Sequence, residues 1–241
     1  MCGIAGFLTK GSHPKTISRI YTELLVRSVR RGYDATGIAI TLANGKMAVA
    51  KGPIPSPKFV EDAIYKEVIN RQPVSVTGHT RAATKGSPQD NRNNHPLVSG
   101  KIVGVHNGTL TNEGYLTRRY NLKRKAEVDS EVIFAILDRI KLLNEESIRQ
   151  TLSLLEGTYA LAFQNGKQPQ VIWLVRGPGR PLVVGYDTRL ETTWFASEAA
   201  FILKAYKTSW IKTKDLEIHE MREGEILSLS QSSIAKRQKM V

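Results

Sequence analysis

The only cysteine of this 241-residue chain stands directly after the start methionine. The side chain that follows Met1 is small, so we expect Met1 to be removed, which leaves Cys2 with a free α-amino group. That amine has a reference pKa of about 7.7–8.0 and the thiol one of about 8.5. Cys2 would then carry both a nucleophile and a base that can take its proton. The alternative is a small buried hydrophobe without chemistry.

Two charged residues further along the chain could bind an amino acid. Arg81, in "GHTRAATKG" at the end of a strand-like segment, offers a planar fork that suits a carboxylate, although most arginines at strand ends are simply solvated. Asp129, in "VDSEVI", is a good N-cap and could also hold an ammonium group. His79 is expected to be a structural, hydrogen-bonded histidine.

The "VHNG" segment could stabilise an oxyanion. Asn107-Gly108 closes a strand-like run and is also a common turn dipeptide. In the functional interpretation, the Asn107 side-chain amide and the Gly108 backbone N–H donate to a developing negative charge. In "RRGYDATGIA", Arg31 and Asp34 stand at a helix-to-strand junction, where the alternative is a helix end with a surface ion pair.

The elements that must position these residues follow from the hydrophobic period. Helical patterns cover residues 17–30, 56–72, 111–120, 129–143, 147–155 and 199–206. Strand-like runs cover 4–9, 36–52 (a hairpin at Asn44-Gly45), 74–82, 101–108, 158–164, 170–177, 181–187 and 192–198, and a last pair, 216–221 and 225–230, surrounds Glu223-Gly224. A polar loop, 84–96, is expected to stay unburied and to be functional.

This order of elements predicts an α+β fold with mainly antiparallel sheets, because no regular βαβ alternation is present. No repeat or linker divides the chain, so one domain over 1–241 is expected, with a basic tail in about the last dozen residues. The single cysteine excludes an internal disulfide, and no Cys/His cluster has zinc spacing. No apolar run approaches a membrane span, so a cytoplasmic protein without membrane contact is expected.

The net charge of +13 is unusual for a metabolic enzyme. Basic residues gather in four clusters: 27–32, 118–125, 204–214 and 237–240. Aromatic residues lie within the second and third clusters, as on many nucleic-acid-binding surfaces. Nucleic acid or another polyanion is therefore one candidate partner. The alternatives are solvated faces without a partner and a partner protein with an acidic surface.

Taken together, the order and spacing of these motifs resemble those of the class II glutamine amidotransferase domain, an N-terminal-nucleophile hydrolase. The motifs are Cys2, the Arg31–Asp34 turn, Arg81, His95, Asn107-Gly108 and Asp129. The resemblance runs from "MCGIAGF" to about "EGEILSLS". "RGYD" and "GHTRAAT" look most like the glucosamine-6-phosphate synthase branch, and "VRGPGRPLVVG" looks more like the amidophosphoribosyltransferase branch. The resemblance implies a four-layer αββα sandwich.

The resemblance also implies roles for individual residues. Cys2 would attack the carboxamide of glutamine and form a γ-glutamyl thioester, with Asn107 and Gly108 stabilising the oxyanion. Arg81 would bind the α-carboxylate of glutamine and Asp129 its α-ammonium group, with Thr84 as a further substrate-binding residue. Supporting roles fall to Arg31 and Asp34, which would order the surroundings of the nucleophile, and to His95, which would shape the loop. No cofactor and no metal are implied.

Two departures from the family pattern bear on these expectations. Ala82 follows the "GHTR" arginine where the family commonly has an aromatic residue, and the family's "DSAG"-like turn reads "DATG" here. No synthase domain is expected in this chain, so ammonia would pass to a separate synthase. Two alternatives remain: a catalytically silent binding or regulatory module with a basic surface facing nucleic acid, and an amidohydrolase acting on another amide.

Overall fold

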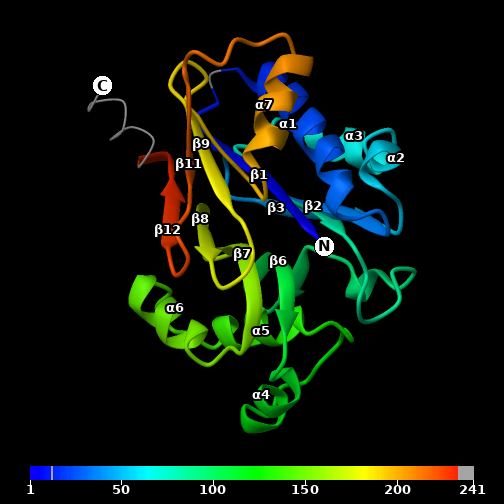
Figure 1. Cartoon of the computed structure of the whole chain (residues 1–241), viewed down its shortest axis with the longest axis vertical. Coiled ribbons are helices and arrows are strands. Elements are labelled where there is room, and N and C mark those ends of the chain that lie inside the picture. The colour runs from blue at the N-terminus through cyan, green and yellow to red at the C-terminus, as the bar shows by residue number, and fades with distance from the viewer. Residues whose placement is uncertain (12, 233–241) are drawn as a thin grey trace.

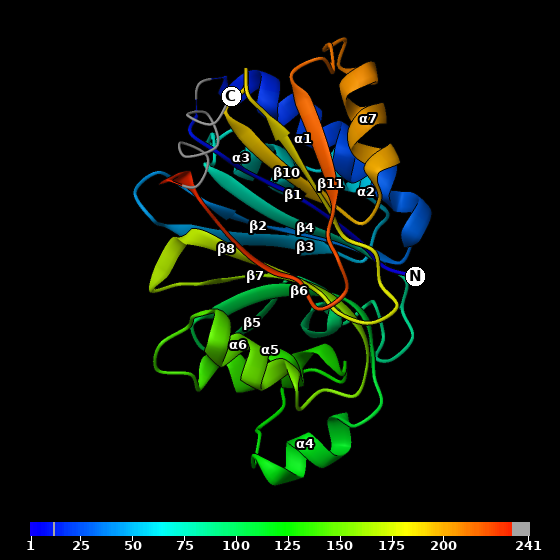
Figure 2. The ribbon, with the colours of Figure 1, turned by 60° about the vertical axis from the view of Figure 1, so that its left-hand side comes forward.

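The computed structural model describes residues 1–11 and 13–232 and shows two β-sheets packed face to face between two layers of helices. Figure 2 shows the four layers nearly edge-on, with helices above the first sheet and below the second. All strand pairs are antiparallel. The predicted α+β class and the four-layer αββα sandwich are thus confirmed. Within these ranges no helix is long and apolar enough to cross a bilayer.

The first sheet has seven strands in the order β11-β9-β10-β1-β4-β2-β3. Their bounds, in that order, are Leu216–Glu220, Val183–Asp187, Thr192–Ala196, Gly3–Thr9, Ser75–Arg81, Ala35–Thr41 and Met47–Gly52. The β2–β3 hairpin turns at Asn44-Gly45 as predicted, because Gly45 takes the positive φ of 81° that this turn requires. β1 is the central strand of this sheet, so Cys2, which directly precedes it, is held in place by strands on both sides.

The second sheet has five strands in the order β12-β8-β7-β6-β5. Their bounds, in that order, are Ile226–Ser230, Gln168–Arg176, Gly157–Asn165, Ile102–Leu110 and Leu97–Ser99. Two helices, α5 (Ser130–Asp138) and α6 (Glu145–Leu152), cover its outer face. α4 (Glu113–Arg119) projects below them (Figure 1). The first sheet is covered by α1 (Pro14–Arg27), α2 (Ser56–Phe59), α3 (Ala63–Ile69) and α7 (Ala199–Thr208).

The alternation of side chains along β1 decides where the chemistry lies. Ile4 and Leu8 belong to the hydrophobic cluster between the two sheets, whereas Ala5 and Phe7 pack under the helices. Because successive side chains of a strand point to opposite faces, the same alternation places Cys2 on the inter-sheet face. In β6, Val105 belongs to the inter-sheet cluster, so Asn107 faces the first sheet as well.

Several predicted elements differ from those observed. The helix predicted over 56–72 is two short helices, because the side chain of Asp62 caps a new start at Ala63. The two last strands do not pair with each other: β11 joins β9 in the first sheet and β12 joins β8 in the second. The segment between them therefore crosses from one sheet to the other.

Two further predictions concern the loop over 84–96 and the C-terminal tail. The loop was expected to stay unburied, yet it buries Asn93 and Asn94 completely and contains the short 3₁₀ helix Asn91–Asn93. The side-chain amides of Asn93 and Asn94 bond neighbouring side chains and backbone carbonyls, which offsets the cost of burying them. The basic tail lies from residue 233 onward outside the described residues.

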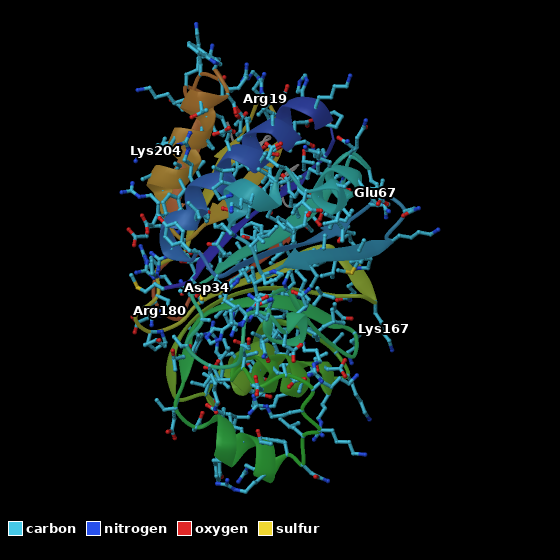
Figure 3. All side chains as sticks on the ribbon, turned by 90° about the vertical axis from the view of Figure 1, so that its right-hand side faces the viewer. Arg19, Asp34, Glu67, Lys167, Arg180 and Lys204 are labelled. Carbon is cyan, nitrogen blue, oxygen red and sulfur yellow. The ribbon has the colours of Figure 1, made fainter. Side chains whose placement is uncertain are left out.

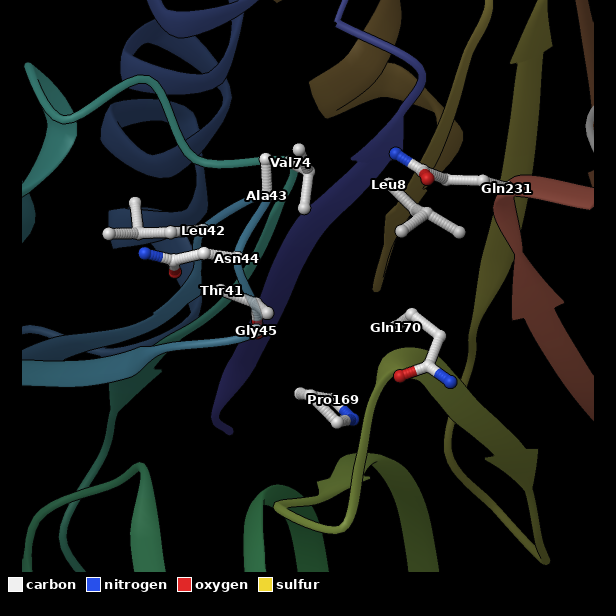
Figure 4. A pocket seen from close by; sticks show the side chains of 10 residues that line it. All are labelled: Leu8, Thr41, Leu42, Ala43, Asn44, Gly45, Val74, Pro169, Gln170 and Gln231. Carbon is white, nitrogen blue, oxygen red and sulfur yellow. The ribbon is translucent and has the colours of Figure 1, made fainter.

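A pocket of about 430 Å³ opens at the far end of the sandwich from Cys2 (Figure 4). Its lining consists of neutral residues, among them Leu8, Thr41, Pro169 and Gln170. Leu8 and Cys2 lie near opposite ends of β1, roughly 20 Å apart along an extended strand. With no ionisable or nucleophilic side chain in its lining, this pocket is separate from the chemistry at Cys2.

Candidate active site

Cys2 lies at the start of β1, where the two sheets meet at the edge that carries the N-terminus (Figure 1). Its Sγ accepts a hydrogen bond from the backbone N–H of Ala82 at 3.4 Å. Burial raises the pKa of the thiol above its usual value, although the Ala82 N–H, the N-terminus and two arginines act to lower it. The resting group is therefore a neutral thiol at neutral pH, and attack on a carbonyl needs a base.

One pocket beside Cys2 contains six of the nine residues predicted for the site. These are Cys2, Arg81, Thr84, His95, Gly108 and Asp129, together with Ala82, Lys85, His106, Val128 and Ser130. The other three predicted residues, Asn107, Arg31 and Asp34, surround the pocket without lining it. Its volume of about 20 Å³ has room for about one water molecule and is too small for an amino acid. In this conformation Thr84 and Lys85 of the loop after β4 belong to its lining, and the Arg81 guanidinium is bonded to the carbonyls of that loop.

Arg81 ends β4 and points its guanidinium into the following loop. Nη1 donates to the Asn94 Oδ1 at 2.8 Å, and Nη2 donates to the backbone carbonyls of Lys85 and Gly86, the latter at 2.8 Å. All three acceptors are neutral groups, so the positive charge of this buried side chain is not balanced by a direct ion pair within the described residues. An incoming carboxylate would supply that balance.

Asp129 is the N-cap of α5, as the sequence suggested. Its Oδ1 accepts from the Ser130 backbone N–H at 2.9 Å and its Oδ2 from the Leu110 N–H at 2.6 Å. These bonds fix the carboxylate at the wall of the pocket, with only 9% of the residue exposed. Each oxygen keeps a lone pair, so the group can also accept from an ammonium.

The Asn107-Gly108 pair lies at the end of β6 next to β7. Asn107 is 1% exposed, and its Nδ2 has no acceptor among the described residues. A buried amide that is left unpaired is unusual and costs free energy, so it is a candidate donor for a ligand. Gly108 adopts a φ of 154°, and a Cβ there would lie 1.9 Å from the Thr158 carbonyl oxygen. Only glycine fits at this position, where β6 runs close beside β7. Gly108 has no side chain, so it lines the pocket with its backbone.

Arg31 and Asp34 position the backbone on either side of the nucleophile. Arg31 Nε donates to the Cys2 carbonyl at 2.8 Å, and its Nη1 pairs with Glu198 at 2.6 Å. Asp34 Oδ2 accepts from the Ala83 N–H at 2.7 Å, and its own N–H donates to the Arg81 carbonyl at 2.9 Å. Arg31 does form an ion pair, as in the alternative for this turn, but with Glu198 rather than with Asp34, and both residues also bond the backbone of segments that line the pocket.

Three buried histidines lie at the pocket, and two of them, His95 and His106, belong to its lining; the sequence indicated no catalytic role for any of the three. The rings of His79 and His95 stack with centroids 4.3 Å apart, and His79 Nε2 bonds the His106 carbonyl at 3.0 Å. His106 Nδ1 bonds the Ser130 Oγ at 2.8 Å, next to Asp129. The contact of His106 with Ser130 was not predicted because "VHNG" contains this histidine without any local signal, and only the packing of α5 on β6 creates the contact.

These histidines predict a loss of stability in acid. Burial lowers the pKa of His79 to about 3, and it lowers the pKa values of His95 and His106 as well. Between the usual pKa of about 6.5 and those lower values, the unfolded chain binds more protons than the folded one. The free energy of unfolding should therefore fall as pH drops below about 6.5, by up to about 1.4 kcal/mol per pH unit for each histidine. Urea denaturation at several pH values measures this slope.

A His79→Gln variant tests this origin of the slope, because glutamine can still donate to the His106 carbonyl but does not titrate in this range. The slope of unfolding free energy against pH should decrease by roughly 1 kcal/mol per unit. The exposed His13, changed to glutamine in the same way, serves as the control and should leave the slope as it is. Equal slopes for the parent and His79→Gln would refute the explanation.

Comparison with known proteins places this geometry in a family. The family model described as "Glutamine amidotransferase domain" matches residues 79–204, a little over half of the chain. The chain is 31% identical over 225 residues to glutamine--fructose-6-phosphate aminotransferase [isomerizing] of Bacillus licheniformis, covering 90% of this chain and 35% of that protein. It is 28% identical over 208 residues to 7-cyano-7-deazaguanine synthase of Saccharolobus solfataricus, covering 82% and 43%.

Solved structures show the same fold. Glutamine phosphoribosylpyrophosphate amidotransferase from B. subtilis superposes with a TM-score of 0.72 at 21% identity, over 96% of this chain and 48% of that one. A glutamine aminotransferase class-II domain protein from Silicibacter pomeroyi superposes with a TM-score of 0.56 at 14% identity, over 95% of both chains. The chain thus spans less than half the length of the curated relatives named above. It belongs to the class II glutamine amidotransferase family, whose N-terminal-nucleophile fold it shares.

Proposed function

We propose that this chain hydrolyses glutamine at Cys2 and delivers the ammonia to an acceptor enzyme on another polypeptide. The observation that carries the proposal is the pocket itself, whose lining combines a thiol with a buried cation, Arg81, and a buried anion, Asp129. An α-amino acid carries the matching carboxylate and ammonium at one carbon. The neutral carboxamide of glutamine can then extend toward Cys2.

The first step requires a proton acceptor for the neutral thiol. Met1 is 69% exposed, and its sulfur receives only weak contacts from Arg31 at 3.7 Å and Arg180 at 3.5 Å. An aminopeptidase can therefore reach it, and its removal would turn the Cys2 backbone nitrogen into an amine. This amine would take the thiol proton directly or through one water, since its reference pKa is about 7.7–8.0.

The sulfur would then form a bond to the carboxamide carbon of glutamine, and the carbonyl π pair would move onto oxygen. Asn107 Nδ2 and the Gly108 N–H would donate to this oxyanion. Collapse of the tetrahedral species breaks the C–N bond, the Cys2 amine returns its proton to the leaving nitrogen, and ammonia departs from a γ-glutamyl thioester. Water then adds to the thioester carbonyl, releasing glutamate and restoring the thiol.

The loop after β4 would have to rearrange for glutamine to enter. The Arg81 guanidinium would exchange the Lys85 and Gly86 carbonyls for the substrate carboxylate, a stronger, charge-assisted pairing. Ala82 leaves more room at the site's edge than the aromatic residue common in the family. The relatives named above are described as an aminotransferase and a synthase, which supports a use of the ammonia beyond its release.

The direct experiment measures ammonia and glutamate released from L-glutamine by the purified protein, with intact mass recorded on the same sample. We expect equal amounts of both products and a mass that lacks Met1. Brief acid quenching during turnover should trap a protein mass increased by one glutamyl group. Release of ammonia by protein that retains Met1 would contradict the proposed base. Co-purification of the tagged chain would identify the acceptor enzyme.

Arg81→Lys is expected to raise the KM for glutamine by about ten- to hundredfold while lowering kcat less. Lysine keeps the charge but cannot offer two parallel N–H groups to one carboxylate, and a charged hydrogen bond contributes about 1.5–3 kcal/mol. Asp129→Asn should raise KM similarly, since an amide pairs poorly with an ammonium. Steady-state kinetics of ammonia release measure both effects.

Arg92→Lys is the matched control for the loop. Arg92 lies on the same loop, is exposed, and forms an ion pair with the neighbouring Asp90. Its replacement should leave KM unchanged within twofold. If Arg81→Lys also leaves KM unchanged, Arg81 does not bind the substrate carboxylate.

A further inference from the structure

An exposed tryptophan at the end of α7 has no role in holding the fold together. Trp210 is 93% exposed, whereas Trp194 and Trp173 are buried. Its φ of 56° lies in the left-handed region, which is unfavourable for a bulky residue. Backbone strain at an exposed residue that packs against nothing is a reason to look for function there.

The backbone around Trp210 forms a helix end that would normally use glycine. The Trp210 N–H donates to the Lys207 carbonyl at 3.1 Å, and the Ile211 N–H donates to the Tyr206 carbonyl at 3.0 Å. This is the Schellman arrangement, in which glycine is preferred at the left-handed position. Tryptophan therefore stands at a position where the backbone favours glycine and where the side chain is not buried. Neither backbone conformation nor packing explains the indole ring, so we look for a function of the ring itself.

The indole is surrounded in sequence by unpaired positive charge. The sixteen residues from 199 to 214 contain no aspartate or glutamate. They include four exposed lysines, Lys204, Lys207, Lys212 and Lys214, for which the described part of the chain provides no ion pair. Arg19 of α1 donates to the Ser209 carbonyl at 3.0 Å, so it adds a fifth cation next to Trp210. Figure 3 shows Arg19 and Lys204 on the helical layer that covers the first sheet.

We propose that this Trp210 platform, consisting of Arg19, Lys204, Lys207, Trp210, Lys212 and Lys214, binds single-stranded nucleic acid. One base would stack on the indole, and the cations would contact the phosphates of neighbouring nucleotides. Stacking on an aromatic ring needs an unpaired base with a free face, which a duplex does not offer. None of the relatives named above is described by name as a nucleic-acid-binding protein, so the proposal depends on this surface alone.

An anionic membrane fits the platform less well. The apolar side chains of α7, including Phe201, Ile202 and Tyr206, are buried against the first sheet, which leaves Leu203 and Trp210 as its exposed apolar groups. A helix that lies in a membrane interface instead presents a broad apolar face to the lipid. Trp210 also lies beyond the opposite end of α7 from Glu198, and the ten residues of the helix between them span about 15 Å. It is therefore independent of the glutaminase pocket, near which Glu198 pairs with Arg31.

The test uses the full chain and fluorescein-labelled short oligouridylate and oligodeoxythymidylate, followed by anisotropy between about 50 and 200 mM salt. Trp210→Gly should weaken binding to both strands by about five- to hundredfold, because stacking on the indole is lost. Its binding to inorganic polyphosphate, which has no bases, should stay within twofold of the parent. The same variant should melt at the same or a higher temperature, since glycine suits the left-handed position.

A matched pair of lysine variants tests what the positive charges of the platform contribute to binding. Lys207→Glu should weaken binding to the oligonucleotides and to polyphosphate and should lessen the salt dependence, whereas Lys167→Glu, an exposed change on the β7–β8 turn, should not. Oligonucleotide affinity within twofold of the parent in Trp210→Gly overturns the proposal. So does Trp210-dependent binding to phosphatidylserine–phosphatidylcholine vesicles without binding to either strand. Ammonia release should be unchanged in all these variants, so a failed glutaminase assay does not affect this test.

Discussion

Replacing Cys2 with alanine is expected to lower the rate of ammonia release from glutamine by a factor on the order of 10⁴ or more. The thiol is the sole cysteine side chain, and the two hydroxyls that share the pocket, those of Thr84 and Ser130, are far less acidic nucleophiles. Glutamine should still bind, because both charged groups remain. The comparison is steady-state ammonia release beside glutamine binding measured by calorimetry.

Two further variants separate the thiol from its amine. Cys2→Ser keeps the size and the free amine but presents a far less acidic nucleophile, so it should retain only a trace of activity. A chain with a residue inserted before Cys2 that resists aminopeptidase keeps the thiol without an adjacent amine, and it should also be inactive. Turnover near the parent rate in either the alanine or the blocked variant would exclude the N-terminal-nucleophile mechanism.

Asn107→Ala is expected to reduce kcat by about 10²–10³ while changing the KM for glutamine less than threefold. The Asn107 amide makes no hydrogen bond through Nδ2 in the resting state, so its partner would be the oxyanion that develops during attack. An interaction made only in the transition state appears in kcat and not in binding. Asn107→Asp, which keeps the shape but has no N–H donor, should lose a similar factor.

Asn112 is the matched control for Asn107, because both ends of its side-chain amide are already hydrogen-bonded. Its side chain donates to the Leu154 carbonyl at 2.9 Å and accepts from the Glu156 N–H at 3.2 Å, so its role is structural. Asn112→Ala should lower the free energy of unfolding by about 1–2 kcal/mol with little change in kcat. If Asn107→Ala instead lowers stability and leaves kcat within threefold, the assignment of the oxyanion donor is wrong.

Local patterns were sufficient to predict most strands, because burial on both sheet faces leaves runs of apolar residues with turn signals between them. The β2–β3 hairpin is one example, since Asn44-Gly45 specifies a tight turn that needs no distant partner. The helix over 56–72 was predicted too long because its apolar period continues through Asp62, where a side-chain cap begins a second helix.

Contacts between segments distant in sequence could not be predicted from local patterns. "LEIHEM" and "EILSLS" have the spacing of a hairpin, yet β11 pairs with β9 in the first sheet and β12 pairs with β8 in the second. Likewise, Asn93 and Asn94 are polar residues of a loop, and they become buried because Glu127, Asn91 and backbone groups satisfy their amides. The loop is therefore part of the wall of the pocket.

The sequence by itself determined the α+β class with mainly antiparallel sheets, the position of a sole thiol beside Met1, and the identities of the charged and amide groups that could serve it. These follow from residue type, period and spacing, which act over short range. Only the tertiary structure decided that Arg81 rests against loop carbonyls, that Asn107 Nδ2 is left without a partner, and that His79, His95 and His106 gather behind them. Those features arise where β4 and β6 face each other across the two sheets, and a contact between distant strands is fixed by packing of the whole chain.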